Sequence, residues 1–146
     1  MNVLGIDPAK NGEHHCAYRY AARVLYNHGM LEDIVAPDVI IVEQPVNQGG
    51  PRAQFALELC KQYGALVERL KHLYPDAQLY TPPANVIRRQ AGYNPRVHGK
   101  ADAYVRAYLE KLGYDMKYWS NPDKRDALMC ALWNFKHPDN QEWREK

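Results

Sequence analysis

Two short apolar runs, each closed by an acid with a proline close behind, constrain the fold of this 146-residue chain more than any other feature. The first is NVLGIDP at Asn2 to Pro8, and the second is VIIVE at Val39 to Glu43. Near-continuous runs of this kind are typical of central strands covered on both faces. If the two strands are parallel, Asp7 and Glu43 emerge at the same edge of the sheet, where open α/β sheets place their sites. Asp-Pro is also ordinary turn punctuation, so Asp7 alone does not establish a site.

The rest of the pattern predicts further strands and helices around these two runs. Strands are expected at residues 15–20, 23–28 and 78–81, and helices at 51–74, 82–89, 100–112 and from Asn121 to about Phe135. Asn121 is a natural helix cap and Pro122 suits the first helical position. We expect a flexible loop at residues 47–51, a mobile basic loop at residues 91–99 and a polar tail from about residue 137. Gly5 predicts a close approach of a neighbouring backbone or ligand to the first strand.

Two more acids, Asp123 and Asp126, lie three residues apart near the start of the last helix and therefore share one of its faces. Acids in a first turn are common because the helix dipole stabilises them by about 0.3 to 1 kcal/mol each, so Asp123 needs no function. Asp126 is followed by Ala127, Leu128 and Met129 and adjoins the packing face of the helix. A carboxylate that is partly buried needs a partner or a metal ion.

Four carboxylates that meet in one place repel one another unless divalent cations neutralise them. The candidates are Asp7, Glu43, Asp123 and Asp126. Ligands that are all oxygen atoms select hard ions, so we expect Mg²⁺ or Mn²⁺. Two such ions about 3.5 to 4 Å apart can activate a water and stabilise the leaving oxygen of a phosphodiester. The pattern therefore predicts metal-dependent phosphodiester hydrolysis, with Asp7 bridging both ions.

Charge is unevenly distributed along the chain, although the net charge is only +2. Residues 86–125 contain nine basic residues against four acids, which leaves this third at +5 and the remainder net acidic. A basic segment beside a carboxylate cluster suits a polyanionic substrate that is cut with the help of a metal. A solvated charged surface would explain the same composition equally well.

The cysteines and histidines carry no site in this interpretation. Cys16, Cys60 and Cys130 are widely spaced with apolar neighbours, as is typical of reduced core residues in an intracellular protein. His14 and His15 are adjacent, so they point to opposite faces of a strand and are poor joint metal ligands. No apolar run reaches the roughly 20 residues that a membrane span needs, and no signal-peptide pattern is present. We therefore expect a soluble cytosolic protein.

Four segments together resemble the RNase H-like nuclease superfamily and, within it, the RuvC-type Holliday-junction resolvases. They are LGIDP at residues 4–8, VEQP at 42–45, HGKADAYV at 98–105 and DKRDALMCAL at 123–132. The resemblance implies one α/β domain over residues 1–146, with a five-stranded mixed sheet flanked by helices. The position of the second acid favours the resolvases over RNase H proper. In RNase H this acid lies on the first long helix, whereas in the resolvases it ends the fourth strand, as Glu43 does. It makes Asp7, Glu43, Asp123 and Asp126 the metal-binding acids.

The resemblance also implies a partner and a substrate. We expect a homodimer that cuts four-way DNA junctions with paired nicks, using two Mg²⁺ or Mn²⁺ ions per site. Lys100 sits where resolvases carry a basic residue near the scissile phosphate, and an exposed first-turn lysine is the alternative. Contacts with the nucleic acid, mostly through its phosphates, are expected from a set of residues in the basic third: Arg88, Arg89, Tyr93, Arg96, Lys100, Lys124 and Arg125.

The chain departs from the bacterial resolvases in one segment and in length. Those enzymes place an aromatic wedge soon after the glutamate of the fourth strand, where this chain has Pro45, Val46, Asn47 and Gln48. Tyr93 or another loop residue is the candidate substitute. The shorter chain suits a phage-encoded relative acting in bacterial or phage-infected cytosol. Alternatives that stay open are a ribonuclease cutting RNA in hybrids, a broader flap or branch nuclease, and a non-catalytic module that binds branched DNA.

Overall fold

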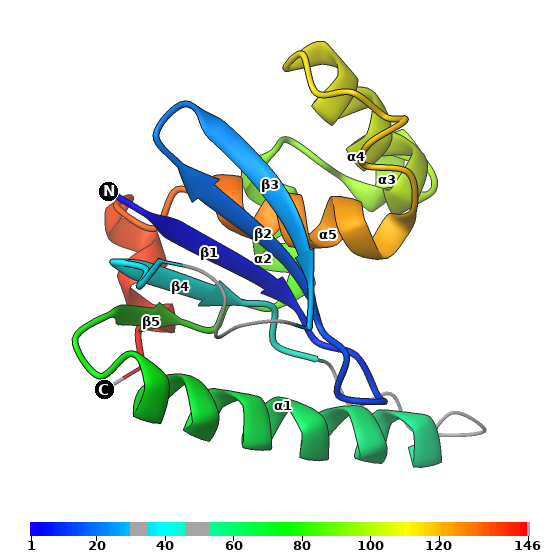
Figure 1. The fold of residues 1–146 in the computed structure, drawn as a ribbon. Coiled ribbons are helices and arrows are strands. Elements are labelled where there is room, and N and C mark those ends of the chain that lie inside the picture. Colours follow the sequence, from blue (N-terminus) through cyan, green and yellow to red (C-terminus); the bar gives the residue numbers. More distant parts are fainter. Residues whose placement is uncertain (30–34, 46–52, 146) are drawn as a thin grey trace.

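A five-stranded mixed sheet forms the centre of the computed structural model, which describes residues 1–29, 35–45 and 53–145. The strands lie in the order β3-β2-β1-β4-β5 (Figure 1). Their bounds are β1 (Val3–Asp7), β2 (His15–Tyr20), β3 (Arg23–His28), β4 (Val39–Val42) and β5 (Gln78–Tyr80). The first three are antiparallel neighbours, whereas β4 runs parallel to β1 and β5 parallel to β4. The predicted fold class is confirmed.

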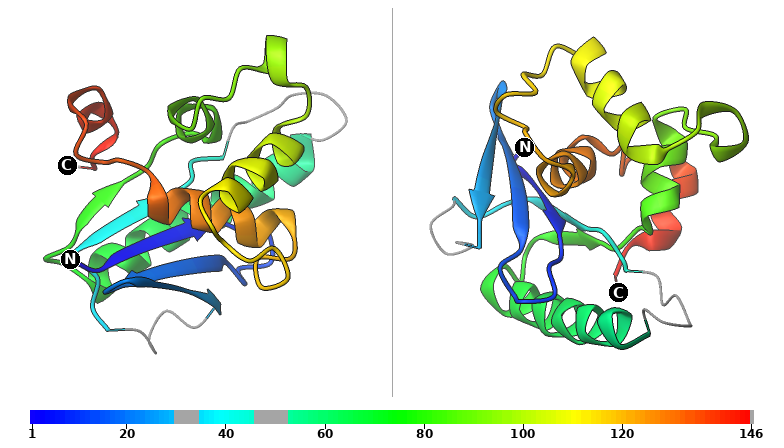
Figure 2. Two further views of the ribbon diagram at one scale, coloured as in Figure 1. Left: turned by 90° about the horizontal axis from the view of Figure 1, so that it is seen from above. Right: turned by 90° about the vertical axis from the view of Figure 1, so that its right-hand side faces the viewer.

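Helices cover both faces of the sheet. Their bounds are α1 (Ala53–Leu73), α2 (Ala84–Gln90), α3 (Pro95–His98), α4 (Ala101–Lys111) and α5 (Pro122–Leu132). On one face, Leu66 and Leu70 of α1 pack against Leu4 and Ile6 of β1. Helices α2, α4 and α5 lie on the other face (Figure 2). Their buried side chains share a core with Val3 of β1 and with Val39 and Ile41 of β4. The alternation of side chains along each buried strand thus builds two separate cores.

Helix α5 lies directly against the centre of β1, and Gly5 permits this. A Cβ atom added to Gly5 would lie 2.3 Å from the backbone nitrogen of Ala131 and 2.6 Å from the carbonyl oxygen of Ala127. The predicted close backbone approach at Gly5 is therefore confirmed, and the neighbouring backbone is that of α5. Because Asp7 follows Gly5 by two residues, the same approach brings the end of β1 close to the start of α5.

The helix ends follow local signals in the sequence. The Asn121 side chain accepts a hydrogen bond from the backbone N–H of Lys124 (2.9 Å), so the predicted cap of the last helix is confirmed. Asn94 caps the short helix α3 in the same way, by accepting from the backbone N–H of Arg96 (3.0 Å). Residues 91–99, predicted to be a loop, therefore contain one helical turn. The loop predicted at residues 47–51 lies outside the described residues.

The polar segment after residue 137 packs onto the sheet instead of forming a tail. Residues Pro138–Trp143 form a 3-10 helix, η3, in which Asn140 is buried. The backbone N–H of Thr81 donates to the carbonyl of Trp143, and that of Glu145 donates to the carbonyl of Leu79, both at 2.8 Å. These bonds pair backbone groups at the outer edge of the sheet, beside β5, which would otherwise be exposed. The backbone pairing explains why a polar segment is held there.

Two smaller expectations concern the cysteines and membranes. All three cysteines are free, with Cys16 and Cys130 buried and Cys60 partly exposed. No helix within the described ranges combines the length and the apolar character that crossing a membrane requires.

Candidate active site

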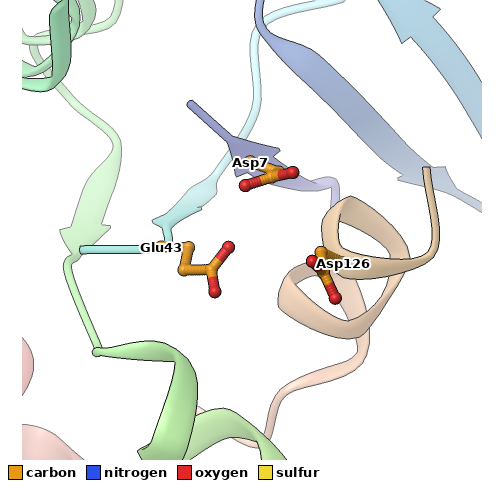
Figure 3. A group of neighbouring side chains, drawn as sticks. All are labelled: Asp7, Glu43 and Asp126. Atoms are coloured by element: carbon orange, nitrogen blue, oxygen red, sulfur yellow. The ribbon is translucent and has the colours of Figure 1, made fainter. Parts of the chain in front are cut away.

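Three of the four predicted acids converge at the carboxyl ends of the central strands. Asp7 is the last residue of β1 and Glu43 follows β4, and because these neighbouring strands are parallel, both carboxylates lie at the same end of the sheet. The backbone N–H of Glu43 donates to the carbonyl of Ile6 (3.0 Å), which extends the ladder to the site. Asp126 comes from α5, and the three carboxylates point toward a common space (Figure 3). One oxygen of each lies within 4.8 Å of the others.

Burial and mutual repulsion disfavour ionisation of this three-acid cluster. Burial raises the pKa of Asp7 far above its ordinary 3.8, and repulsion from Glu43 raises it further. Burial likewise raises the pKa of Glu43. The pKa of Asp126 rises to about 7 for the same two reasons, although the nearby guanidinium of Arg88 opposes the rise. An all-oxygen cluster that tolerates its own charge so poorly fits a hard divalent cation, because the ion would replace the protons.

The shifted pKa of Asp126 predicts how the metal-free protein responds to pH. The pKa of Asp126 rises from 3.8 to about 7 on folding, so the unfolded state loses its proton first as the pH rises. The free energy of unfolding is therefore unaffected below pH 3.8, falls between pH 3.8 and about 7, and is reduced by the full amount above about pH 7. Asp126→Asn removes this reduction. In EDTA, we expect the variant to melt roughly 10 to 15 °C above wild type at about pH 8 and at the same temperature near pH 4.

Circular-dichroism melts across this pH range measure the difference in melting temperature between the two proteins. Other groups titrate alike in both proteins, so their effects cancel in this difference. Added Mn²⁺ should reverse the order of the two proteins, since the wild type binds the ion more tightly. A pH-independent difference between the two melting temperatures would contradict this account of the cluster.

The cluster opens onto a cavity of about 790 Å³ that could admit a substrate. The turn after β1, the start of β2, the ends of β3 and β4, the start of α1 and the cation of Arg88 contribute to its wall. At its rim the ring of Phe55 is 52% exposed, and the Lys10 ammonium lies 5.3 Å from the ring centre. The cavity thus combines half-buried acids with an aromatic surface and cations at its edge.

Asp123, the fourth predicted acid, lines this cavity but stands apart from the other three. Its side chain is 61% exposed, and its Oδ2 atom lies 3.6 Å from Nε2 of His15. Burial lowers the pKa of His15, an effect that the Asp123 carboxylate opposes. The structure therefore brings together Asp7, Glu43 and Asp126 and leaves Asp123 on the wall beside them.

The sequence interpretation missed His15 and His28, which both line the cavity. Asp7 pairs directly with His15 across the β1–β2 ladder, and His15 pairs with His28 across the β2–β3 ladder. Directly paired residues project from the same face, so the three side chains form a row at the end of the sheet. The register of the hairpin closed by residues 9–12 was the available signal, because it places His15 opposite Asp7.

The predicted phosphate-binding residues occupy different positions. Arg88 lines the cavity, with its Nη2 atom 3.9 Å from Oδ1 of Asp126. Three others, Arg89, Arg96 and Lys100, are exposed on or between α2 and α4. Lys100 occupies the N-cap position of α4 without a side-chain capping bond, and it is not among the described residues that line the cavity.

Two further members of the predicted set, Lys124 and Tyr93, contact tyrosine rings. The ammonium of Lys124 lies 4.6 Å from the ring centre of Tyr26. Tyr93 is half-buried, its hydroxyl donates to the carbonyl of Gly99, and its ring packs on Tyr104. These contacts make Tyr93 a poor substitute for a mobile wedge. Of the segment where bacterial resolvases carry the wedge, residues 46–48 lie outside the described ranges.

Arg125 was predicted to contact phosphate, and this prediction is wrong. Its side chain is buried, with Nη2 3.1 Å from Oδ1 of Asp102 and Nη1 donating to the carbonyl of Trp119 (3.2 Å). The guanidinium therefore joins α5 to the start of α4 and to the segment before α5. A buried cation paired in this way is not available to a ligand, because losing its partner would leave a carboxylate and a guanidinium unsatisfied.

The strand order of the mixed sheet and the helices on both of its faces are those of an RNase H-like fold. No family model matches the chain. The curated proteins contain no match either.

Among solved structures, the chain is similar to RuvC of Thermus thermophilus. The structure of that RuvC in complex with Holliday junction substrate matches with a TM-score of 0.53 and 12% identity, over 90% of this chain and 91% of that one. The structure of Thermus thermophilus RuvC matches with a TM-score of 0.52 and 13% identity, over 99% of both chains. The chain therefore has a RuvC-like fold.

Proposed function

We propose that the protein is a metal-dependent endonuclease that resolves four-way DNA junctions with paired nicks. The observation that carries the proposal is the convergence of Asp7, Glu43 and Asp126 in an open cavity at the edge of a RuvC-like sheet. The solved RuvC that is bound to a Holliday junction supports this choice of substrate. A surface that only binds DNA would gain nothing from a cluster of half-buried acids that repels phosphates, which disfavours a non-catalytic module.

The four acids would hold two Mg²⁺ or Mn²⁺ ions: Asp7, Glu43, Asp123 and Asp126. Such ions, when bound, supply an activated water and stabilise the leaving oxygen of a phosphodiester. Asp7 is repelled by all three of the other acids and is the candidate ligand shared by both ions. The remaining chemistry belongs to cations that hold the phosphate and offset its developing charge.

Arg88 is better placed than Lys100 to meet the scissile phosphate, because it lines the cavity beside the acids. Its guanidinium would offset transition-state charge, and while no substrate is bound it partly balances Asp126. Lys100 and the exposed Arg89 and Arg96 would contact phosphates further along the strand, which makes binding strongly salt-dependent. Phe55, exposed at the rim, would stack on an unpaired base.

A homodimer would supply the two active sites that symmetric cutting requires, because a four-way junction must be nicked in two strands of like polarity. We propose that each protomer contributes one cavity and that the protein acts in the cytosol of a bacterium or a phage-infected host.

Incubation of the protein with a synthetic mobile four-way junction tests the proposal. We expect paired nicks when Mg²⁺ or Mn²⁺ is present and none in EDTA, with activity restored when the metal is returned. Matched linear duplex, flap and RNA–DNA hybrid substrates with the same arm sequences are the controls. A linear duplex cut as readily as the junction would exclude a resolvase, and preferential cutting of the hybrid would establish the ribonuclease alternative.

A further inference from the structure

The position of Asp123 poses a structural question. Three acids are held close together, but Asp123 lies on an exposed first turn of α5, where a side chain is free to change rotamer. Neither the backbone of α5 nor the helix dipole fixes the direction of this carboxylate. A contact with a rigid neighbour can do so, and the neighbour that meets it is His15 of β2.

His15 is itself held firmly. Its Nδ1 atom shares a hydrogen bond of 2.6 Å with the hydroxyl of Tyr26, and its ring stacks on His28 with a centroid distance of 4.9 Å. The His15 side chain is only 17% exposed. Tyr26 is fixed in turn, because its backbone N–H donates to the hydroxyl of Tyr118 (2.8 Å) and Lys124 covers its ring. The sheet thus presents the imidazole at a defined position beside the acids.

The hydrogen bond between Nδ1 of His15 and Tyr26 leaves the other ring nitrogen, Nε2, to face the Asp123 carboxylate. When the Tyr26 phenol donates to Nδ1, the ring hydrogen is on Nε2, which is the nitrogen that faces Asp123. Nε2 lies 3.6 Å from one carboxylate oxygen, Oδ2. A carboxylate that is held through Oδ2 retains a second oxygen, Oδ1, that can bind a cation.

We propose that His15 is a positioning residue, which fixes the Asp123 carboxylate so that it can hold the second of two metal ions. The proposal rests on the proposed function in that it takes the cluster as a site for two cations. Asp7, Glu43 and Asp126 suffice for the first ion, whereas the second depends on Asp123 and, through it, on His15 and Tyr26. Neighbours that orient a metal ligand usually affect metal affinity about 10- to 100-fold.

Titration of the DNA-free protein with Mn²⁺, followed by the electron paramagnetic resonance of the free ion, tests this role. We expect wild type to bind two ions. His15→Ala and His15→Phe should weaken the second ion about 10- to 100-fold and leave the first unchanged. His15→Gln should restore much of the affinity, because its amide nitrogen can occupy the position of Nε2. His72→Ala, which removes an exposed histidine from the end of α1, should bind as wild type does.

A double-mutant cycle separates positioning from a general loss of stability. Asp123→Ala should weaken the same ion, and His15→Phe combined with Asp123→Ala should weaken it no further, since both changes remove one interaction. His15→Phe retains the ring and keeps the test usable if His15→Ala does not fold. Equal Mn²⁺ binding by His15→Phe and wild type, a single ion on wild type, or additive effects in the cycle would overturn the proposal.

The readout contains no DNA, so it is independent of the proposed reaction. If two ions bind as described and no junction is cut, the nuclease proposal fails while the role of His15 stands. If junctions are cut but His15→Phe binds both ions normally, the role of His15 fails while the nuclease proposal stands.

Discussion

Asp7→Asn should abolish junction cleavage while junction binding persists. The carboxylate belongs to the acid cluster, where repulsion from Glu43 adds to the burial that raises its pKa. An amide keeps the shape of the side chain but cannot supply the charge that a divalent ion requires. Because neighbours of metal ligands alone affect function about 10- to 100-fold, we expect a loss of at least about 100-fold for a bridging ligand. Cleavage rates with Mn²⁺ measure the effect.

Binding of the junction is measured separately, by gel shift in EDTA. The variant should bind at least as tightly as wild type, because removing an acid from a cavity that receives phosphates lowers repulsion. Asp76→Asn, at an exposed acid after α1, is the matched control and should cut at the wild-type rate. Cleavage retained by Asp7→Asn would exclude Asp7 as an essential ligand and with it the proposed site.

Gly5→Ala should destabilise the whole protein, although it adds only one methyl group. The added Cβ would lie 2.3 Å from the backbone nitrogen of Ala131 and 2.6 Å from the carbonyl oxygen of Ala127, and neither can turn aside as a side chain would. Helix α5 must therefore move away from β1. Overpacking of this kind costs about 3 kcal/mol or more, so we expect a melting temperature roughly 10 °C lower.

The variant should also lose activity beyond its loss of stability, because moving α5 separates Asp126 from Asp7. Thermal unfolding and Mn²⁺ affinity at a temperature where the variant is folded measure the two effects. Gly64→Ala is the matched control: a Cβ there meets nothing within 4 Å, and the change should stabilise α1 by about 0.5 to 1 kcal/mol. A Gly5→Ala protein as stable as wild type would contradict the close packing of α5 on β1.

Several elements of the fold could be predicted because their signals are local. The runs that end at Asp7 and Glu43 are buried on both faces, so their strands read as continuous apolar sequence. Asn121 and Pro122 mark the start of α5 because capping depends only on neighbouring backbone groups. The 3-10 helix at Pro138–Trp143 escaped prediction, since its polar residues are held by backbone bonds to a distant strand.

The candidate site was predictable in part for the same reason. Two of its acids end core strands, and Asp126 adjoins an apolar helix face, so each has a local pattern that indicates its direction. Arg125 and Lys100 have no such pattern. Both occur in a basic third of the chain, yet one is buried against Asp102 and the other is exposed at a helix cap.

The sequence by itself determined which strands are central, that two of them end in acids, and where the last helix begins, because hydrophobic runs and caps act over a few residues. Only the tertiary structure decided that His15 and His28 join the cavity, that Arg125 serves the packing of α4 on α5, and that Asp123 stands apart from the other acids. These outcomes depend on strand register and helix rotation, which are set by contacts between residues far apart in the chain.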